Sequence, residues 1–218
     1  MKTIYLLVLI FQINPVAVQS QIIPAGQRAL YFKFFEDEGN ILWIDAREGL
    51  KMPAENLISE ESVSMTLFGK NWILSDELID YGMVEFIPAG QDHDSWQEII
   101  TIQRLDAGGK SLKSLHKQLR KIREKNCPGK TVYSRILREE NKTLLFESRV
   151  ENCNKYGTQS EIKIMLAPPT LTLYQYTVWI VEYTKKDNEI EPVKREEIQN
   201  WLNSLSLLSY KELQPYLK

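Results

Sequence analysis

Residues 111–127, SLKSLHKQLRKIREKNC, are the stretch of sequence that decides the fold. Their apolar residues recur at spacings of 3, 4 and 3, which is one stripe on a helical period: Leu112, Leu115, Leu119 and Ile122. Ser111 can cap the start of this helix, and the segment Cys127-Pro128-Gly129 stops it. The pattern predicts a helix over 111–126 with one apolar side, and His116 is expected to pack at the edge of that side.

Runs rich in aromatic and β-branched residues surround this helix and predict strands. Before the helix we expect strands at 29–35, 41–45, 63–68, 72–74, 83–87 and 98–104, the first two joined by a turn at 37–40 and the next two paired through 69–71. After the helix we expect a hairpin of 130–137 with 144–150, then strands at 161–166 and 170–183. In the strand at 161–166, the charged residues are expected to face outward. A second helix is predicted from Pro192 to Ser209, with a stripe of Ile198, Trp201, Leu202, Leu205 and Leu208.

The order of these elements indicates the fold class. Strands in runs, interrupted by only two strong helices, favour an α+β fold with an antiparallel sheet over alternating βαβ units. Each helix has one apolar stripe, so each is expected to cover one face of the sheet. A chain of about 200 residues suits one domain, and we therefore expect residues 21–218 to form a single α+β domain.

The first twenty residues have the pattern of a secretory signal peptide. Lys2 precedes a nearly unbroken apolar run from Ile4 to Phe11, and Val18 and Ser20 suit the −3 and −1 positions of a cleavage site before Gln21. The alternative is an uncleaved anchor, but the run is shorter than the ~20 apolar residues of a spanning helix. We expect an exported protein, periplasmic or extracellular, with no transmembrane segment in the mature chain.

Export affects the interpretation of Cys127 and Cys153, the only two cysteines. In an oxidising compartment two cysteines usually pair, whereas in a cytosolic enzyme one can be a nucleophile. Cys127 follows a predicted helix, and the negative end of the helix dipole disfavours the thiolate that a nucleophile needs. We therefore predict a structural disulfide. By lowering the entropy of the unfolded chain, it should stabilise the folded state by about 3.5 kcal/mol.

Composition and motifs exclude several functions. With 43% hydrophobic and 26% charged residues the chain is an ordinary globular protein, and its net charge of −2 gives no positive field for nucleic acid. It has no G-x-S-x-G, H-E-x-x-H, P-loop or dinucleotide motif. No catalytic residue, metal ligand or cofactor is assigned.

Three surfaces are candidates for binding. The first is the loop of Asp92, His93 and Asp94 with the nearby Trp96, which has the side chains of a metal or acid–base site but also the composition of a solvated turn. The second is the basic side of the first helix, able to meet an anionic surface or to act only as a solubilising face; its residues are Lys113, Lys117, Arg120 and Lys121. The third is an aromatic groove or, alternatively, core filling, from Phe86, Trp96, Tyr174, Tyr176 and Trp179.

One loose motif carries a family resemblance. A strand ending in Pro88-Ala89-Gly90 is followed by a polar loop, Trp96 and a second strand, then by a helix, an antiparallel sheet and a C-terminal helix with Trp201. This layout, over about residues 60–210, resembles small exported bacterial proteins with the Mog1/PsbP-like α/β/α sandwich. The resemblance implies the fold, and the family carries no shared catalytic set that maps onto these positions. Residues 29–74 depart from it and are expected to add an N-terminal hairpin layer.

These observations favour an exported, non-enzymatic binding protein whose partner is an unknown protein or envelope component. Two alternatives remain open at this point. One is a secreted hydrolase or metal-dependent enzyme that uses Asp92, His93 and Asp94, and the other is a carrier of a small ligand.

Overall fold

The computed structural model describes residues 22–23, 25–26, 28–31, 61–75, 83–92, 94–140, 142–168 and 177–209. The predicted signal peptide, the predicted strand at 41–45 with its turn, and the first part of the strand predicted at 170–183 lie outside these ranges.

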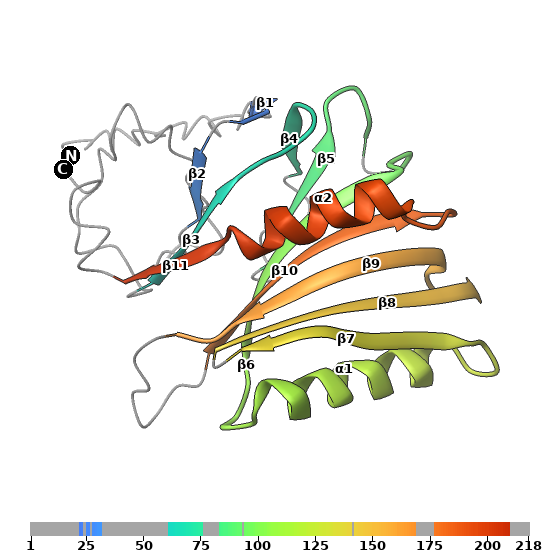
Figure 1. The fold of residues 1–218 in the computed structure, drawn as a ribbon. Coiled ribbons are helices and arrows are strands. Elements are labelled where there is room, and N and C mark those ends of the chain that lie inside the picture. Colours follow the sequence, from blue (N-terminus) through green and yellow to red (C-terminus); the bar gives the residue numbers. More distant parts are fainter. Residues whose placement is uncertain are drawn as a thin grey trace, which may run out of the picture.

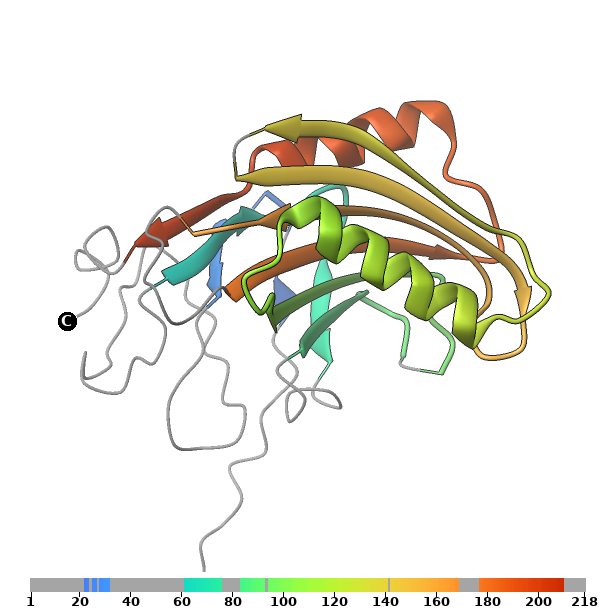
Figure 2. The same cartoon turned by 90° about the horizontal axis from the view of Figure 1, so that it is seen from below.

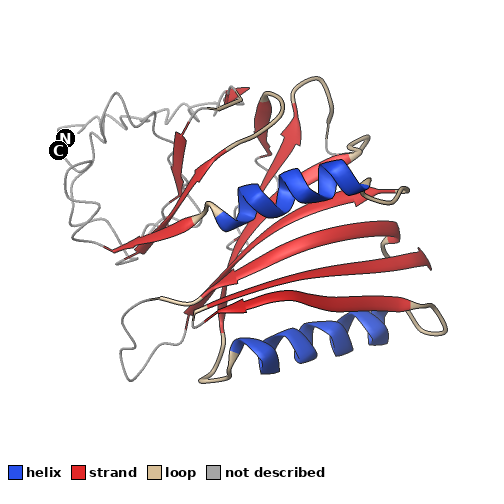
Figure 3. Cartoon of the chain, viewed as in Figure 1, coloured by secondary structure: helices blue, strands red, loops and turns tan. Residues whose placement is uncertain are grey.

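The described residues form an α+β fold around a large antiparallel sheet with strand order β1-β4-β5-β6-β10-β9-β8-β7 (Figure 1). In that order the strands are Ile22–Ile23, Trp72–Ser75, Met83–Pro88, Glu98–Asp106, Thr177–Lys186, Gly157–Leu166, Thr143–Cys153 and Val132–Glu140. A smaller sheet contains β11 (Ser206–Ser209), β3 (Glu61–Thr66) and β2 (Arg28–Tyr31). The helices are α1 (Leu112–Asn126) and α2 (Pro192–Asn203). The predicted α+β class with an antiparallel sheet is confirmed, and Figure 3 shows its helices and strands.

The two helices pack on opposite faces of the large sheet (Figures 1 and 2). Successive side chains of a strand point to opposite faces, and β8 shows the consequence. Leu144 and Phe146 belong to the core cluster under α1, whereas Leu145, between them, belongs to the cluster under α2. The cluster under α2 is the larger one and includes the fully buried Trp72 and Trp179. Each helix therefore covers one sheet face, as its single apolar stripe predicts.

Helix α1 begins and ends as the sequence predicts. The Ser111 hydroxyl accepts a hydrogen bond from the Ser114 amide, and the Cys127 amide donates to the carbonyls of Arg123 and Glu124 at the other end. The predicted stripe needs one correction, because Ile122 is 46% exposed. Its neighbour Arg123 lies toward the sheet instead, where it pairs with Glu161.

The hairpin predicted between β3 and β4 is wrong. Strand β3 pairs with β2 and β11, whereas β4 pairs with β1 and β5. Between them the chain passes from one sheet to the other, with Leu67 and Trp72 buried and the Trp72 indole donating to the Phe68 carbonyl at 3.0 Å. Gly69, at φ +74°, allows this path because it has no Cβ. Burial of Leu67 and Trp72 therefore stabilises this connection, although β3 and β4 do not pair with each other.

The second helix is shorter than its sequence pattern. It ends at Asn203, and Ser204 bonds back to the Trp201 carbonyl through its amide and its hydroxyl, which uses an acceptor of the last turn. The next residues form β11, with Ser206 opposite Ser64 of β3. The closely spaced leucines from 205 to 208 suit a strand as well as a helix, so the pattern alone cannot locate the end of the helix.

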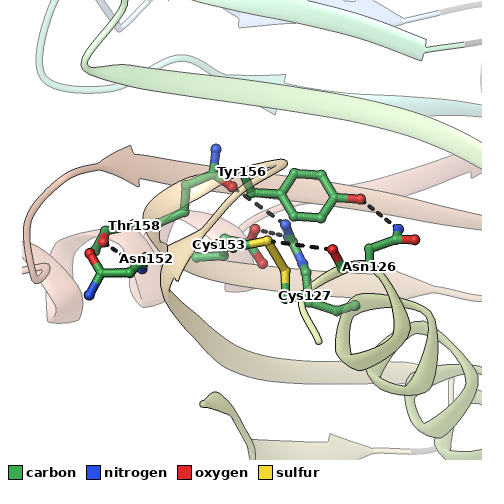
Figure 4. The surroundings of a disulfide bond; sticks show 9 residues. Asn126, Cys127, Asn152, Cys153, Tyr156 and Thr158 are labelled. Atoms are coloured by element: carbon green, nitrogen blue, oxygen red, sulfur yellow. Dashed lines mark hydrogen bonds and ion pairs between the residues drawn. A yellow bond between two sulfur atoms is a disulfide. The ribbon is translucent and has the colours of Figure 1, made fainter. Parts of the chain in front are cut away.

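Cys127 and Cys153 form the predicted disulfide, with their Cα atoms 5.2 Å apart (Figure 4). Both cysteines are buried and pack with Val150, and Val132 and Tyr156 lie against them. The bond joins the C-terminus of α1 to the end of β8 and supports an oxidising compartment, as export would provide. Within the described ranges, neither helix has the length and apolarity that a bilayer span requires.

Replacing both cysteines should measure this covalent link. We expect Cys127→Ala with Cys153→Ala to lower the free energy of unfolding by about 3 kcal/mol, because the open chain regains the entropy of a loop with a sequence separation of 26. Urea unfolding of the oxidised chain, the chemically reduced chain and the double variant measures the difference. A loss below about 1 kcal/mol in the double variant would contradict a stabilising role.

Candidate functional site

An open groove of about 340 Å³ lies on the α1 side of the large sheet. Helix α1 lies over β7 and β8, and the groove occupies the neighbouring part of the same face, over β5, β6, β10 and β9. Arg123 of α1 reaches its floor, and Trp96 and Tyr156, each from a loop, line it. The groove exists because one helix is too narrow to cover so wide a sheet.

Four charged side chains form what we call the ion-pair chain: Arg123, Glu161, Lys163 and Glu182. All but Lys163 line the groove, and Glu85 of β5 lines it as well. The guanidinium of Arg123 bonds one oxygen of Glu161, and the Lys163 ammonium lies 3.0 Å from the other. The same ammonium is 2.6 Å from Glu182. Two positive and two negative charges give no net charge. The Glu161 side chain is only 2% exposed, so its contacts are shielded from water.

Strand register brings these charges together. Glu161 and Lys163 are two residues apart in β9 and share a face, and Lys163 stands directly opposite Glu182 of β10. That face is the one under α1, because Met165 of the same parity packs in the α1 core cluster. The outward orientation predicted for the charges of this strand is therefore wrong. The prediction failed because α1 covers part of the polar face of this strand, where its Arg123 pairs with Glu161.

Hydroxyl groups complete the ligation of both carboxylates. Ser148 of β8 donates to Glu161 at 2.6 Å, and Thr184 of β10 donates to Glu182 at 2.6 Å. Ionised buried groups need such partners, because removal from water costs several kcal/mol for each ion. Every charged group of the ion-pair chain thus has a partner of opposite charge, and both carboxylates also have a hydroxyl donor.

The pKa shifts of Glu182 and Lys163 agree with the pairing of these charges. Burial by itself would raise the pKa of Glu182, but the neighbouring Lys163 ammonium and the hydrogen bonds outweigh it, so that the pKa of Glu182 is lowered. Burial lowers the pKa of Lys163, and Glu182 opposes that effect. Glu182 is therefore a carboxylate at neutral pH, held by its partners.

The rim of the groove is tied to the disulfide. The Tyr156 ring lies 4.3 Å from the Arg123 guanidinium, and its hydroxyl accepts a 2.8 Å hydrogen bond from Asn126 (Figure 4). Tyr156 also packs against Cys127 and Cys153. On the other side, the Lys186 ammonium lies 5.3 Å from the Trp96 ring. Two aromatic rings, each beside a cation, therefore line a groove that contains the ion-pair chain and Glu85.

The predicted loop site is only partly present. Asp92 and Asp94 are exposed, and His93 lies outside the described residues. The Asp92 carboxylate accepts hydrogen bonds from the Asp94 amide and from the Ser95 amide and hydroxyl, so it closes a turn. Of this set only Trp96 lines the groove. Among described residues there is no group of three or more His, Cys, Asp or Glu arranged to hold a metal ion.

The basic side of α1 is partly neutralised. Lys113 pairs with Glu139 at 2.7 Å and Arg120 with Glu124 at 2.8 Å. Lys117 and Lys121 are exposed, and neither makes an ion pair with a residue that the structure describes. The predicted aromatic groove is not assembled, because Phe86 and Trp179 are fully buried in the core under α2 while Trp96 lies on the α1 side. Tyr174 and Tyr176 lie outside the described residues.

Sequence reasoning missed the ion-pair chain, although a signal exists. Glu182 interrupts the apolar run Trp179-Ile180-Val181 in a strand buried on both faces, where a lone acid needs a partner. Arg123 directly follows the predicted apolar stripe. Neither signal identifies the partner residue. Arg123 and Glu161 are 38 positions apart, and their pairing depends on where α1 lies on the sheet.

Comparison with protein families and with curated proteins gives no template for this groove. No protein-family model matches the chain, and no curated protein matches its sequence. Its role is therefore argued from geometry.

Neutralising Glu161 should test the ion-pair chain. We expect Glu161→Gln to lower the free energy of unfolding by about 3 kcal/mol or more, because it leaves two buried cations with one carboxylate. The matched control is Glu124→Gln in the exposed pair with Arg120, which should cost less than about 1 kcal/mol. Equal losses in urea unfolding would show that burial of the network contributes nothing.

His116 should make stability depend on pH. It is buried, its Nε2 lies 2.8 Å from the Ser134 hydroxyl, and its ring contacts Phe146 at 4.6 Å. Burial, and then the nearby Arg120, lower the pKa of His116, so the unfolded chain binds its proton first as the pH falls. Stability present above about pH 6.5 is therefore lost below it.

We expect the free energy of unfolding to fall between about pH 7 and pH 5, and His116→Phe to flatten that slope. Urea unfolding at several pH values measures it. His93→Gln, which changes the other histidine, should retain the slope. A slope unchanged in His116→Phe would assign the pH dependence to other groups.

Proposed function

We propose that this chain is an exported, non-enzymatic binding protein and that the groove beside α1 is its binding site. The observation that carries the proposal is the occupied floor, in which every charge of the ion-pair chain already contacts an opposite charge. Such a floor is preorganised, so a ligand meets a fixed surface and no side chain must be ordered on binding.

The same occupation argues against acid–base chemistry in the groove. A general acid or base works best with a pKa near the working pH and within reach of the reacting proton. The pKa of Glu182 is instead lowered, and both oxygens of this carboxylate have partners in Lys163 and Thr184. The alternative enzyme based on Asp92, His93 and Asp94 has less support, because the Asp92 carboxylate closes its own turn.

The chemistry of the lining indicates the kind of partner. Thr101, Gln103 and Gln159 offer hydroxyl and amide groups, and Trp96 and Tyr156 offer ring surface. The ion-pair chain beside them has no net charge, and Glu85 adds one carboxylate. This combination suits a polar segment of low charge from a protein or envelope component. The predicted leader and the disulfide support an encounter outside the cytoplasm.

We further infer that the scaffold is of the Mog1/PsbP-like α/β/α kind. The antiparallel sheet with α1 and α2 on opposite faces supports this, as does the C-terminal helix with Trp201. The small sheet of β2, β3 and β11 is then an addition to that layout.

A second contact is favoured by the outer side of α1. Lys117 and Lys121 project their charges without an ion pair to any described residue, so an anionic surface can approach them. We propose this side as an auxiliary contact that orients the groove toward a negatively charged envelope.

Retention of a partner should depend on the groove. With the mature chain immobilised against extract from its native compartment, we expect Trp96→Ala to reduce the retained partner at least tenfold, because it removes a ring from the groove. Val193→Ala, at an 83% exposed position of α2 on the other face of the sheet, should retain it. Quantitative mass spectrometry of the eluates is the measurement. Repeated recovery of no partner, or equal retention by Trp96→Ala, would contradict the assignment.

A further inference from the structure

A second cavity, of about 320 Å³, opens on the opposite face of the sheet beside α2. Three arginines from three elements line it: Arg135 of β7, Arg149 of β8 and Arg195 of α2. Ile162 and Ile190 provide apolar surface between them. We call this cavity the arginine cleft. Its volume is at the small end of the range for small-molecule sites.

One well-shielded acid serves two of these arginines. The Glu147 side chain is 11% exposed and lies 2.9 Å from the Arg135 guanidinium and 3.7 Å from that of Arg195. The Tyr133 hydroxyl donates to the same carboxylate at 3.3 Å. Glu147 therefore contributes one negative charge between two positive ones.

The acidic partners of the third arginine are exposed. Arg149 lies 2.8 Å from Glu189 and 2.8 Å from Glu151, whose side chains are 72% and 50% exposed. Ion pairs with such exposed groups are weak, because water and salt compete for both charges. The Arg149 side chain itself is 25% exposed, and it also donates a 3.4 Å hydrogen bond to the buried Ser160 hydroxyl.

We propose that the arginine cleft binds an oxyanion, a carboxylate or phosphate group carried by a small ligand. Two shielded acids line the cleft, Glu147 and Glu161, but the Glu161 carboxylate is already paired with Arg123 and Lys163. A positive excess therefore remains whenever Glu189 turns to solvent. Arg149 presents planar N–H donors that match the oxygens of either group in a bidentate contact. In the unliganded chain the Glu189 carboxylate takes the place that the oxyanion fills.

The start of α2 adds to the positive character of the cleft. Ile190 and Arg195, on either side of its first residues, both line the cavity, and the cap residue Glu191 makes no side-chain hydrogen bond to the helix. The N-terminus of a helix carries a partial positive charge, which favours an anion nearby.

Isothermal titration calorimetry on the mature chain tests the proposal with three probes: inorganic phosphate, citrate and the uncharged sugar glucose. We expect one or both anions to bind and glucose not to bind. Arg149→Gln should weaken anion binding at least tenfold. Glu189→Gln, at an exposed position that should not disturb folding, should strengthen it about threefold or more, because the internal competitor is removed.

The matched control is Arg138→Gln. Arg138 is in the same strand as Arg135 but pairs with Glu140 and is not part of the cleft lining, so its loss should leave the affinity unchanged. Equal weakening by Arg138→Gln and Arg149→Gln would show a diffuse charge effect and overturn the proposal. Absence of anion binding in both the parent and Glu189→Gln would also overturn it. Trp96→Ala should not alter anion affinity, so this site and the groove fail independently.

Discussion

The buried carboxylate of Glu161 is the constraint on which the α1 side of this molecule depends. An ionised group that is 2% exposed must be matched by opposite charge and hydrogen bonds, and its partners here come from three different elements. Arg123 comes from α1, Lys163 from the same strand and Ser148 from β8. Satisfying one carboxylate thus fixes where the C-terminal half of α1 lies on the sheet, and it explains why Ile122 is left exposed.

The disulfide and the ion-pair chain act on the same end of α1. Cys127 is the cap residue of the helix and is bonded to Cys153 at the end of β8, while Arg123 is one turn earlier. Tyr156 contacts both features and lines the groove. The covalent bond therefore limits how far the helix end can move, and the electrostatic network sets the side of the sheet that stays uncovered. A groove with a fixed rim follows from the two together.

The sequence predicts features that depend on local pattern. Residues close in the chain determine three of these features: the cap at Ser111, the apolar stripe of α1 and the hairpin of β7 and β8. Because the chain has only two cysteines, only one disulfide can form within it. Prediction from the sequence fails where distant residues compete. Three features depend on contacts that the linear pattern does not contain: the placement of β3 and β4 in different sheets, the strand β11 after α2, and the burial of Glu161. The candidate groove belongs to this second group, so that only Trp96 was predicted among its residues.

The groove and the arginine cleft use the same residue types and differ in the exposure of the partners. In the groove, Glu161 and Glu182 are shielded and each contacts a shielded cation, so an incoming charge would have to break a buried pair. In the cleft, Arg149 pairs with Glu189, whose carboxylate keeps most of its hydration, so exchanging one anion for another changes little except the identity of the partner. Burial therefore determines which ion pairs hold the fold together and which are available to a ligand. The same reasoning underlies our two proposals, a partner of low charge for one face of the sheet and an anion for the other.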